Sequence, residues 1–174
     1  MRLWMIWPLL SLLLLLHDAA AQTLTNITVD DTDPSVSYVG SWEPSASHLS
    51  SLDIGGSHTL SEDPNGSATF TFTGMSALVL KVFNSKIELT PFVAAGVAVY
   101  YLSPKWPYTV NSYVSLDGGP AVLVDMTGPP ANSPNGQETI ASAPLWGVTG
   151  LTNGVHRVVV TIGPSGYAVV DGFM

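Results

Sequence analysis

Short stretches in which apolar and polar residues alternate recur along this chain, separated by clusters of Gly, Pro, Asn, Asp and Ser. In residues 68–73 both phenylalanines fall on one face and the threonines on the other, and Val158, Val160 and Ile162 alternate likewise. Such alternation predicts antiparallel strands with one buried and one exposed face. The predicted strands cover residues 25–29, 35–42, 58–60, 68–73, 97–102, 111–117, 121–126, 138–145, 156–162 and 167–171.

Helical periodicity is almost absent from the chain, and turn signals occur between the strands at near-regular spacing. About ten short strands of this kind predict a single all-β domain, an antiparallel two-sheet sandwich. The rest of this predicted domain is organised around the stretch from Val97 to Met126. There Leu116-Asp117-Gly118-Gly119 separates two apolar runs, and Gly118-Gly119 supplies the positive φ angles that a tight hairpin turn requires.

Residues 1–21 have the pattern of a secretory signal peptide. A basic start is followed by an apolar run over residues 3–16 and by Ala19-Ala20-Ala21, a small-residue cleavage site. The apolar run is shorter than the ~20 residues that span a bilayer. We expect cleavage and a secreted or cell-surface mature chain, residues 22–174, that begins near Gln22. An uncleaved anchor is the alternative.

Charge and cysteine content narrow the functions of the mature chain. The net charge is −8 and does not change when Arg2 and Asp18 leave with the leader, so we expect no nucleic acid as a partner. Cysteine is absent from the sequence, so the core must hold a secreted fold without disulfides. The sequons Asn26-Ile27-Thr28 and Asn65-Gly66-Ser67 predict glycosylation of Asn26 and Asn65.

The segment formed by residues 75–96 interrupts this pattern. Without it, the strand that ends at Gly74 continues directly into the strand that starts at Val97. Codons for Gly74-Met75-Ser76 can contain GTATGT, a splice donor favoured in fungi, and codons for Ala95-Gly96 can contain the acceptor CAG. We therefore interpret the segment as a retained in-frame intron. A genuine extra hairpin or helix on the sandwich is the alternative.

Several motifs of the mature chain occur together in one set of proteins. They are ITVDDTDPSVSYVGSW, SATFTFTG, VAVYYLSPKWPY, YVSLDGG, GLTNGVHRVVVTIG and YAVVDG. With these motifs the chain resembles secreted or membrane-anchored proteins of mushroom-forming fungi (basidiomycetes), which carry an extracellular sandwich similar to galactose-binding-like jelly rolls. The resemblance covers nearly all of the mature chain except residues 75–96. It implies a jelly-roll fold and a fungal, extracellular protein.

The end of the chain departs from this set of proteins. Its members often continue past the last strand into a Ser/Thr-rich linker and a transmembrane helix, whereas this sequence stops at Met174. We therefore expect that the membrane anchor is not present in this chain. The resemblance also implies that ligands bind on loops at one end of the sandwich or on an exposed sheet face.

An aromatic loop in the central stretch is the first candidate for a ligand site. Tyr101, Trp106 and Tyr108 lie close together, and Pro104 and Pro107 stiffen the turn between them. Rigid aromatic rings suit the apolar C–H faces and the hydroxyls of sugars. These three residues are therefore the candidate ligand site, for carbohydrate or a cell-wall glycan. We nevertheless favour the interpretation that the rings pack between the sheets or plug one end of the sandwich.

Trp42 and a group of aspartates favour a structural interpretation. Trp42 ends an alternating strand, so we expect it in the core. Asp30, Asp31 and Asp33 could offer oxygen ligands to the Ca²⁺ that jelly rolls of the resembled kind sometimes hold, but they lack an EF-hand pattern. We expect a turn with Asx hydrogen bonds there, and no metal or other cofactor.

Three further residues have side chains capable of acid–base chemistry. Asp117 fits the hairpin turn by conformation alone, and His156 opens a core strand as a half-buried histidine. Asp171 lies among apolar residues of the last strand and needs a partner if it is buried. His156 on a neighbouring strand is one such partner.

Motifs of known catalytic machinery are absent from the sequence: it has no G-x-S-x-G elbow, no HExxH, no P-loop and no cysteine nucleophile. We therefore expect that the protein is not an enzyme and that it is a non-catalytic extracellular module that binds carbohydrate. One alternative is a structural or sensor ectodomain with protein partners. The other is a secreted hydrolase, whose paired carboxylates cannot be recognised from spacing alone.

Overall fold

The computed structural model describes residues 26–74, 77–83, 86–92, 97–130 and 136–174, so the predicted signal peptide lies outside the described residues. Strands account for nearly all regular structure in this part of the chain, beside two short 3₁₀ turns, η2 (Ser45–Ser47) and η3 (Ile54–Gly56). No helix found among the described residues is both long enough and apolar enough to cross a bilayer.

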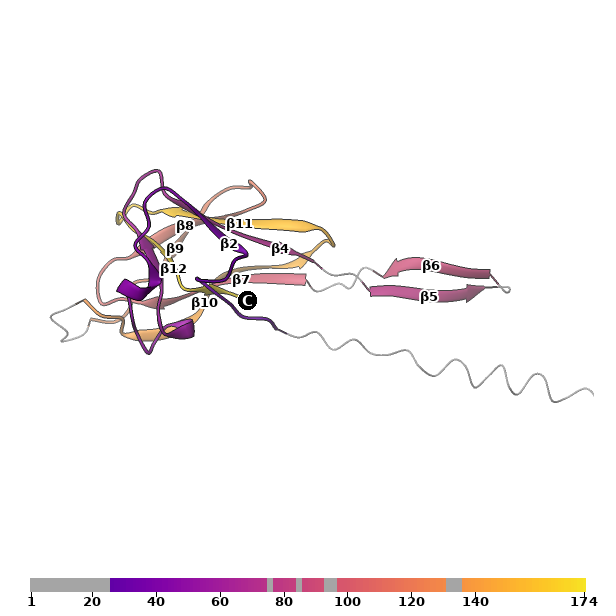
Figure 1. Ribbon diagram of the computed structural model, residues 1–174, viewed down its shortest axis with the longest axis horizontal. Helices are drawn as coiled ribbons and strands as arrows, with labels where there is room; N and C mark the ends of the chain where they lie inside the picture. Colours follow the sequence, from indigo (N-terminus) through magenta and orange to yellow (C-terminus); the bar gives the residue numbers. More distant parts are fainter. Residues whose placement is uncertain (1–25, 75–76, 84–85, 93–96, 131–135) are drawn as a thin grey trace, which may run out of the picture.

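Two antiparallel sheets pack face to face, which confirms the predicted sandwich (Figure 1). The four-stranded sheet has the order β1 (Val29–Asp30), β13 (Gly172–Phe173), β7 (Val97–Lys105) and β10 (Ile140–Leu151). The five-stranded sheet has the order β2 (Val36–Val39), β4 (Ser67–Thr73), β11 (Val155–Ile162), β8 (Asn111–Leu116) and β9 (Val122–Asp125). Apart from the hairpin formed by β8 and β9, most neighbours in the order are not consecutive in the sequence, as in Greek-key and jelly-roll folds.

The C-terminal segment changes sheets at Asp171. Before this residue, β12 (Ala168–Val170) pairs with β3 (Thr59–Ser61) in a small sheet, and after it β13 joins the four-stranded sheet. The Asp171 backbone accepts a hydrogen bond from the Asp31 amide, and its Oδ1 accepts one from the Ile54 amide at 2.9 Å. The crossover therefore holds a buried carboxylate beside η3.

Side chains from both sheets interdigitate in one core. The ring of Phe70 stacks on Phe173 with centroids 4.6 Å apart, and Val158 and Val160 are fully buried, as their alternation predicted. Tyr101 is fully buried as well, and its hydroxyl donates to the Val169 carbonyl. A buried hydroxyl without such an acceptor is costly, about 1–3 kcal/mol.

The predicted hairpin between β8 and β9 is confirmed, with one correction to its turn. Gly119 N donates to the Leu116 carbonyl at 2.8 Å, which closes the turn. The positive φ angles belong to Asp117 (51°) and Gly118 (71°), not to the Gly118-Gly119 pair. Positive φ at both central residues defines a type I′ turn, for which Asp-Gly is a preferred sequence.

The segment that interrupts the sequence pattern contains a separate hairpin, β5 (Ala77–Phe83) paired with β6 (Lys86–Phe92). Figure 1 shows it projecting from the sandwich beyond β4 and β7. The two ends of the sandwich chain meet without it: a Cβ built on Gly74 would lie 3.3 Å from the Val97 side chain. The backbone thus agrees with the alternative of an extra hairpin. The interpretation of residues 75–96 as a retained intron stays a prediction.

Candidate functional site

The aromatic loop proposed from the sequence is mostly part of the core. Tyr101 and Trp106 have exposed fractions of 0% and 4%, and the rings of Trp106 and His58 form a T-shaped pair with centroids 5.4 Å apart. Buried rings cannot stack on a ligand, so for these two residues the structure corrects the binding interpretation in favour of packing. Tyr108 is 43% exposed, and its hydroxyl donates to the Gly136 carbonyl at 3.2 Å.

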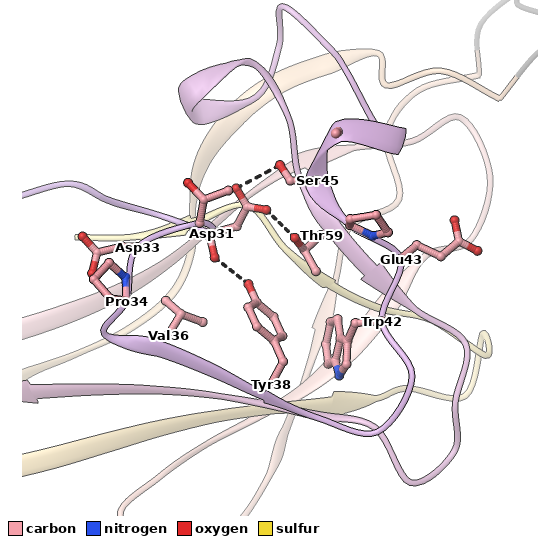
Figure 2. A pocket seen from close by; sticks show the side chains of 12 residues that line it. Asp31, Asp33, Pro34, Val36, Tyr38, Trp42, Glu43, Ser45 and Thr59 are labelled. Carbon is pink, nitrogen blue, oxygen red and sulfur yellow. Dashed lines mark hydrogen bonds between the residues drawn. The ribbon is translucent and has the colours of Figure 1, made fainter.

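A groove with a volume of about 580 Å³ lies between the loop after β1, strand β2 and the turn η2 (Figure 2). We call it the Tyr38–Trp42 groove after its two aromatic residues. Small-molecule sites have volumes of this order and are mostly apolar with a few polar groups. The lining residues are Asp31, Thr32, Asp33, Pro34, Val36, Tyr38, Trp42, Glu43, Pro44, Ser45, Ala46 and Thr59.

Two aromatic rings form the apolar wall of this groove. Tyr38 and Trp42 lie with ring centroids 5.0 Å apart and planes inclined by 59°. Their polar atoms are already bonded, since the Tyr38 hydroxyl donates to the Asp31 carbonyl at 2.7 Å and Trp42 Nε1 donates to the Val39 carbonyl at 3.0 Å. Trp42 is half-buried and lines the groove, so its prediction as a core residue was only partly right.

The carboxyl groups of the loop after β1 have different environments. Asp31 is 1% exposed and accepts hydrogen bonds from the hydroxyls of Thr59 and Ser45. Burial raises the pKa of Asp31, whereas the hydroxyl and amide of Ser35 lower the pKa of Asp33 by donating to it. The Asp33 contacts are the Asx turn that the sequence predicted.

Glu43 lies at the rim of the groove, where solvent reaches it. Its side chain is 58% exposed, and its Oε2 lies 2.8 Å from His48 Nε2. The groove therefore combines an aromatic wall with carboxylate acceptors at its edge (Figure 2).

A histidine–aspartate pair, His156 with Asp117, lies elsewhere on the sandwich. His156 Nδ1 lies 2.7 Å from Asp117 Oδ2, and His156 Nε2 lies 2.8 Å from the Thr152 carbonyl. Both ring nitrogens are thus occupied by Asp117 and Thr152. The suggestion that His156 pairs with Asp171 was wrong, because the crossover places the Asp171 carboxylate at the Ile54 amide instead.

A second, buried group of titratable side chains escaped sequence reasoning. Asp53, His58 and Glu138, which we call the His58 cluster, offer ligand atoms that all lie within 4.8 Å of one another. Asp53 and His58 are close in sequence around η3, which is a weak signal. Glu138 joins them only because the chain just before β10 passes η3, and no spacing in the sequence indicates this contact.

Comparison with solved structures supports the fold assignment. The chain is similar to three structures of exo-β-1,3-galactanase from Phanerochaete chrysosporium, one with galactose and two variants with β-1,3-galactotriose. Identities are 19–20%, TM-scores are 0.51–0.52, and the matches cover 86–87% of this chain but 29% of the galactanase chain. At this identity the likeness shows the fold, a jelly-roll-like β-sandwich. No protein-family model and no curated protein matches the chain.

The comparison also corrects one expectation from the sequence. The absence of catalytic motifs led us to expect that the protein is not an enzyme, whereas the similar structures are hydrolases by name. That expectation is contradicted and is withdrawn. The motif argument failed because glycoside hydrolysis needs only two suitably placed carboxyl groups, which leave no short motif.

Proposed function

We propose that this domain binds carbohydrate and that the Tyr38–Trp42 groove receives the sugar. The observation that carries the proposal is the groove itself, with two aromatic rings as its wall and carboxylates at its edge. The C–H face of a sugar ring packs well on such rings, while its hydroxyls donate to carboxylate oxygens. Because Tyr38 and Trp42 are held by hydrogen bonds to Asp31 and Val39, their rings lose little freedom on binding.

Galactose and short β-1,3-galactans are the first ligands to test. The similar structures contain galactose or β-1,3-galactotriose, and this chain spans less than a third of the galactanase. Galactose-type sugars carry an apolar patch of C–H groups on one face, which suits an aromatic wall of the size that Tyr38 and Trp42 provide.

Calorimetric titration with β-1,3-galactotriose, together with a glycan array, tests this proposal. We expect Trp42→Ala to weaken sugar affinity about tenfold or more, since an aromatic contact is worth about 1–1.5 kcal/mol. Tyr108→Ala is the matched control, because it removes an exposed aromatic ring that does not line the groove. If Tyr108→Ala abolished binding and Trp42→Ala did not, the groove would be the wrong site. Thermal melts establish that both variants fold.

Hydrolysis by the same groove is the second candidate function. Two of its carboxyl groups have pKa values displaced in opposite directions, Asp31 upward and Asp33 downward. Enzymes that cleave glycosides separate an acid from a base in this manner. Release of reducing sugar from β-1,3-galactan, lost in Asp31→Asn while sugar binding persists, would support it. Binding without any product release would leave carbohydrate recognition as the function.

We further propose that the protein acts outside the cell, in the manner of the fungal proteins that its motifs resemble. The support is the leader pattern in residues 1–21 and the exposure of Asn26 and Asn65, because a sequon must be accessible to carry a glycan. We expect that protein secreted by a fungal host starts near Gln22 and loses mass on treatment with an N-glycosidase. An unprocessed intracellular product would contradict this localisation.

A further inference from the structure

The His58 cluster brings together three potential ligands from separate parts of the chain. His58 Nδ1 lies 2.8 Å from Asp53 Oδ2 and 3.4 Å from Glu138 Oε1. Four ligands around a tetrahedral ion with bonds of about 2.1 Å lie about 3.4 Å from one another. The separation between His58 and Glu138 matches that spacing, and Asp53 Oδ2 would move away from His58 Nδ1 to admit an ion.

The side chains of this cluster are shielded from solvent. The side chains of Asp53, His58 and Glu138 are 0%, 4% and 9% exposed. Within the described part of the chain, no lysine or arginine forms an ion pair with these carboxylates; every ion pair there involves a histidine. Buried carboxylates without a cation carry a large desolvation cost.

An unpartnered oxygen in the cluster points to the same deficit of positive charge. Asp53 Oδ1 is buried and has no hydrogen-bond partner among the described residues. Since buried polar atoms in proteins are almost always paired, this oxygen indicates a missing partner.

We propose that the His58 cluster binds a divalent transition-metal ion of the Zn²⁺ class. Asp53, His58 and Glu138 supply two oxygen ligands and one imidazole nitrogen. The nitrogen favours Zn²⁺ over Ca²⁺ or Mg²⁺, which take oxygen ligands almost exclusively. The ion would tie η3, the start of β3 and the segment before β10 together, a structural role that stands whether or not the groove binds sugar.

A proton on His58 is the alternative to a metal ion as the positive charge between the three side chains. Protonated His58 could donate to Asp53 or to Glu138, but one Nδ1 hydrogen cannot satisfy both carboxylates fully, and it leaves Asp53 Oδ1 without a partner. A divalent ion satisfies more acceptors with twice the charge. Metal binding and a proton-bridged cluster therefore predict different stoichiometry and different responses to chelator.

Calorimetric titration of chelator-treated protein with ZnCl₂ tests the proposal directly. We expect one Zn²⁺ per chain, a higher melting temperature with Zn²⁺ than with EDTA, and a change in the fluorescence of Trp106, whose ring faces His58. A crystal grown with Zn²⁺ should show an anomalous peak at the zinc edge between the three side chains. Absence of saturable binding, or binding of Ca²⁺ in place of Zn²⁺, would overturn the proposal.

Variants distinguish this cluster from adventitious binding by surface histidines. Glu138→Gln and Asp53→Asn each remove one ligand charge with little change in shape, and each should weaken Zn²⁺ affinity roughly tenfold or more. His156→Gln is the matched control, because His156 also has an aspartate on Nδ1 but belongs to the other pair. Loss of binding in His156→Gln with retention in Glu138→Gln would refute the assignment. The anomalous peak of the unmodified protein does not depend on how the variants fold.

Discussion

His58 and His156 each have an aspartate oxygen on Nδ1, at 2.8 and 2.7 Å, and both histidines are buried, yet their carboxylate partners differ in exposure. His58 follows η3, and its partner Asp53 has a fully buried side chain. His156 lies on β11 opposite Phe72, near the end of β4 after which the β5–β6 hairpin follows in the chain, and its partner Asp117 is 43% exposed.

The two pairs differ in whether the aspartate partner is buried or exposed, and this decides which charges stay unpaired. The Asp117 carboxylate beside His156 is partly solvated, and its Oδ1 accepts a hydrogen bond from the Arg157 amide. The second ring nitrogen of His156 is hydrogen-bonded to the Thr152 carbonyl. Around His58, a second carboxylate is added and a buried oxygen of Asp53 stays unpaired. The first arrangement is complete by itself, whereas the second calls for a further ligand.

Alanine substitution of each histidine measures this difference and should give the largest effect. With EDTA present, we expect His58→Ala to lower the free energy of unfolding by about 3 kcal/mol, since it leaves buried carboxylates without a donor. His156→Ala should cost less, about 1 kcal/mol, because water can solvate the exposed carboxylate of Asp117 that it leaves behind. Urea unfolding of both variants gives the two values. Equal losses would show that burial does not separate the two pairs.

The pH dependence of stability should reveal the pair formed by His156 and Asp117. Its hydrogen bond to Asp117 raises the pKa of His156 above 6.5, so its contribution is complete below about pH 6.5 and is lost as pH rises through the raised value. Hydrogen bonds from His156 and from the Arg157 amide lower the pKa of Asp117 below 3.8. The contribution of Asp117 to stability is therefore lost only as pH falls through the lowered value.

The pair is therefore most stabilising between about pH 4 and 6.5. We expect Asp117→Asn to lose about 0.5 kcal/mol more at pH 5.5 than at pH 8.5, a size typical of solvent-screened pairs. Urea unfolding of the variant and the parent at both pH values measures it. A difference of the opposite sign would contradict the assigned shifts. Salt should shrink the effect, which offers a further check.

Removal of the hairpin should have the smallest effect of all. Deleting residues 75–96 joins Gly74 to Val97, which already lie side by side, and keeps the bond from the Gly74 amide to the Gly154 carbonyl. We expect a folded sandwich whose free energy of unfolding differs by about 1 kcal/mol or less. Sugar and metal affinities should stay within about twofold of the parent. An unfolded product would show that the hairpin is part of the domain.

Local pattern was sufficient to find most of the strands. The alternation in β4 and β11 reflects burial of one face, and the Asp-Gly turn between β8 and β9 requires positive φ, so both features are encoded within a few residues. The order of the strands needed more than pattern. For example, β13 at the C-terminal end lies between β1, from the N-terminal part of the chain, and β7, from its middle.

The candidate sites were much less accessible to sequence reasoning. Clustering of aromatic residues singled out Tyr101, Trp106 and Tyr108, but alternation along β7 turns Tyr101 inward, and the fold buries Trp106 against His58. Trp42 was assigned to the core because it continued the alternation of β2. That strand ends at Val39, so the ring is free to line the groove instead.

The fold class and the local turns could be predicted from the sequence, because hydrophobic period and turn chemistry act over a few neighbouring residues. The folded structure was needed to show which aromatic rings face solvent, which carboxylates are buried, and which distant residues meet. Glu138 reaches Asp53 and His58 through packing of the segment before β10 against η3, and Asp171 is buried because the last strand changes sheets there. Such long-range contacts depend on how the strands are ordered and paired, and the residues involved carry no local mark of it.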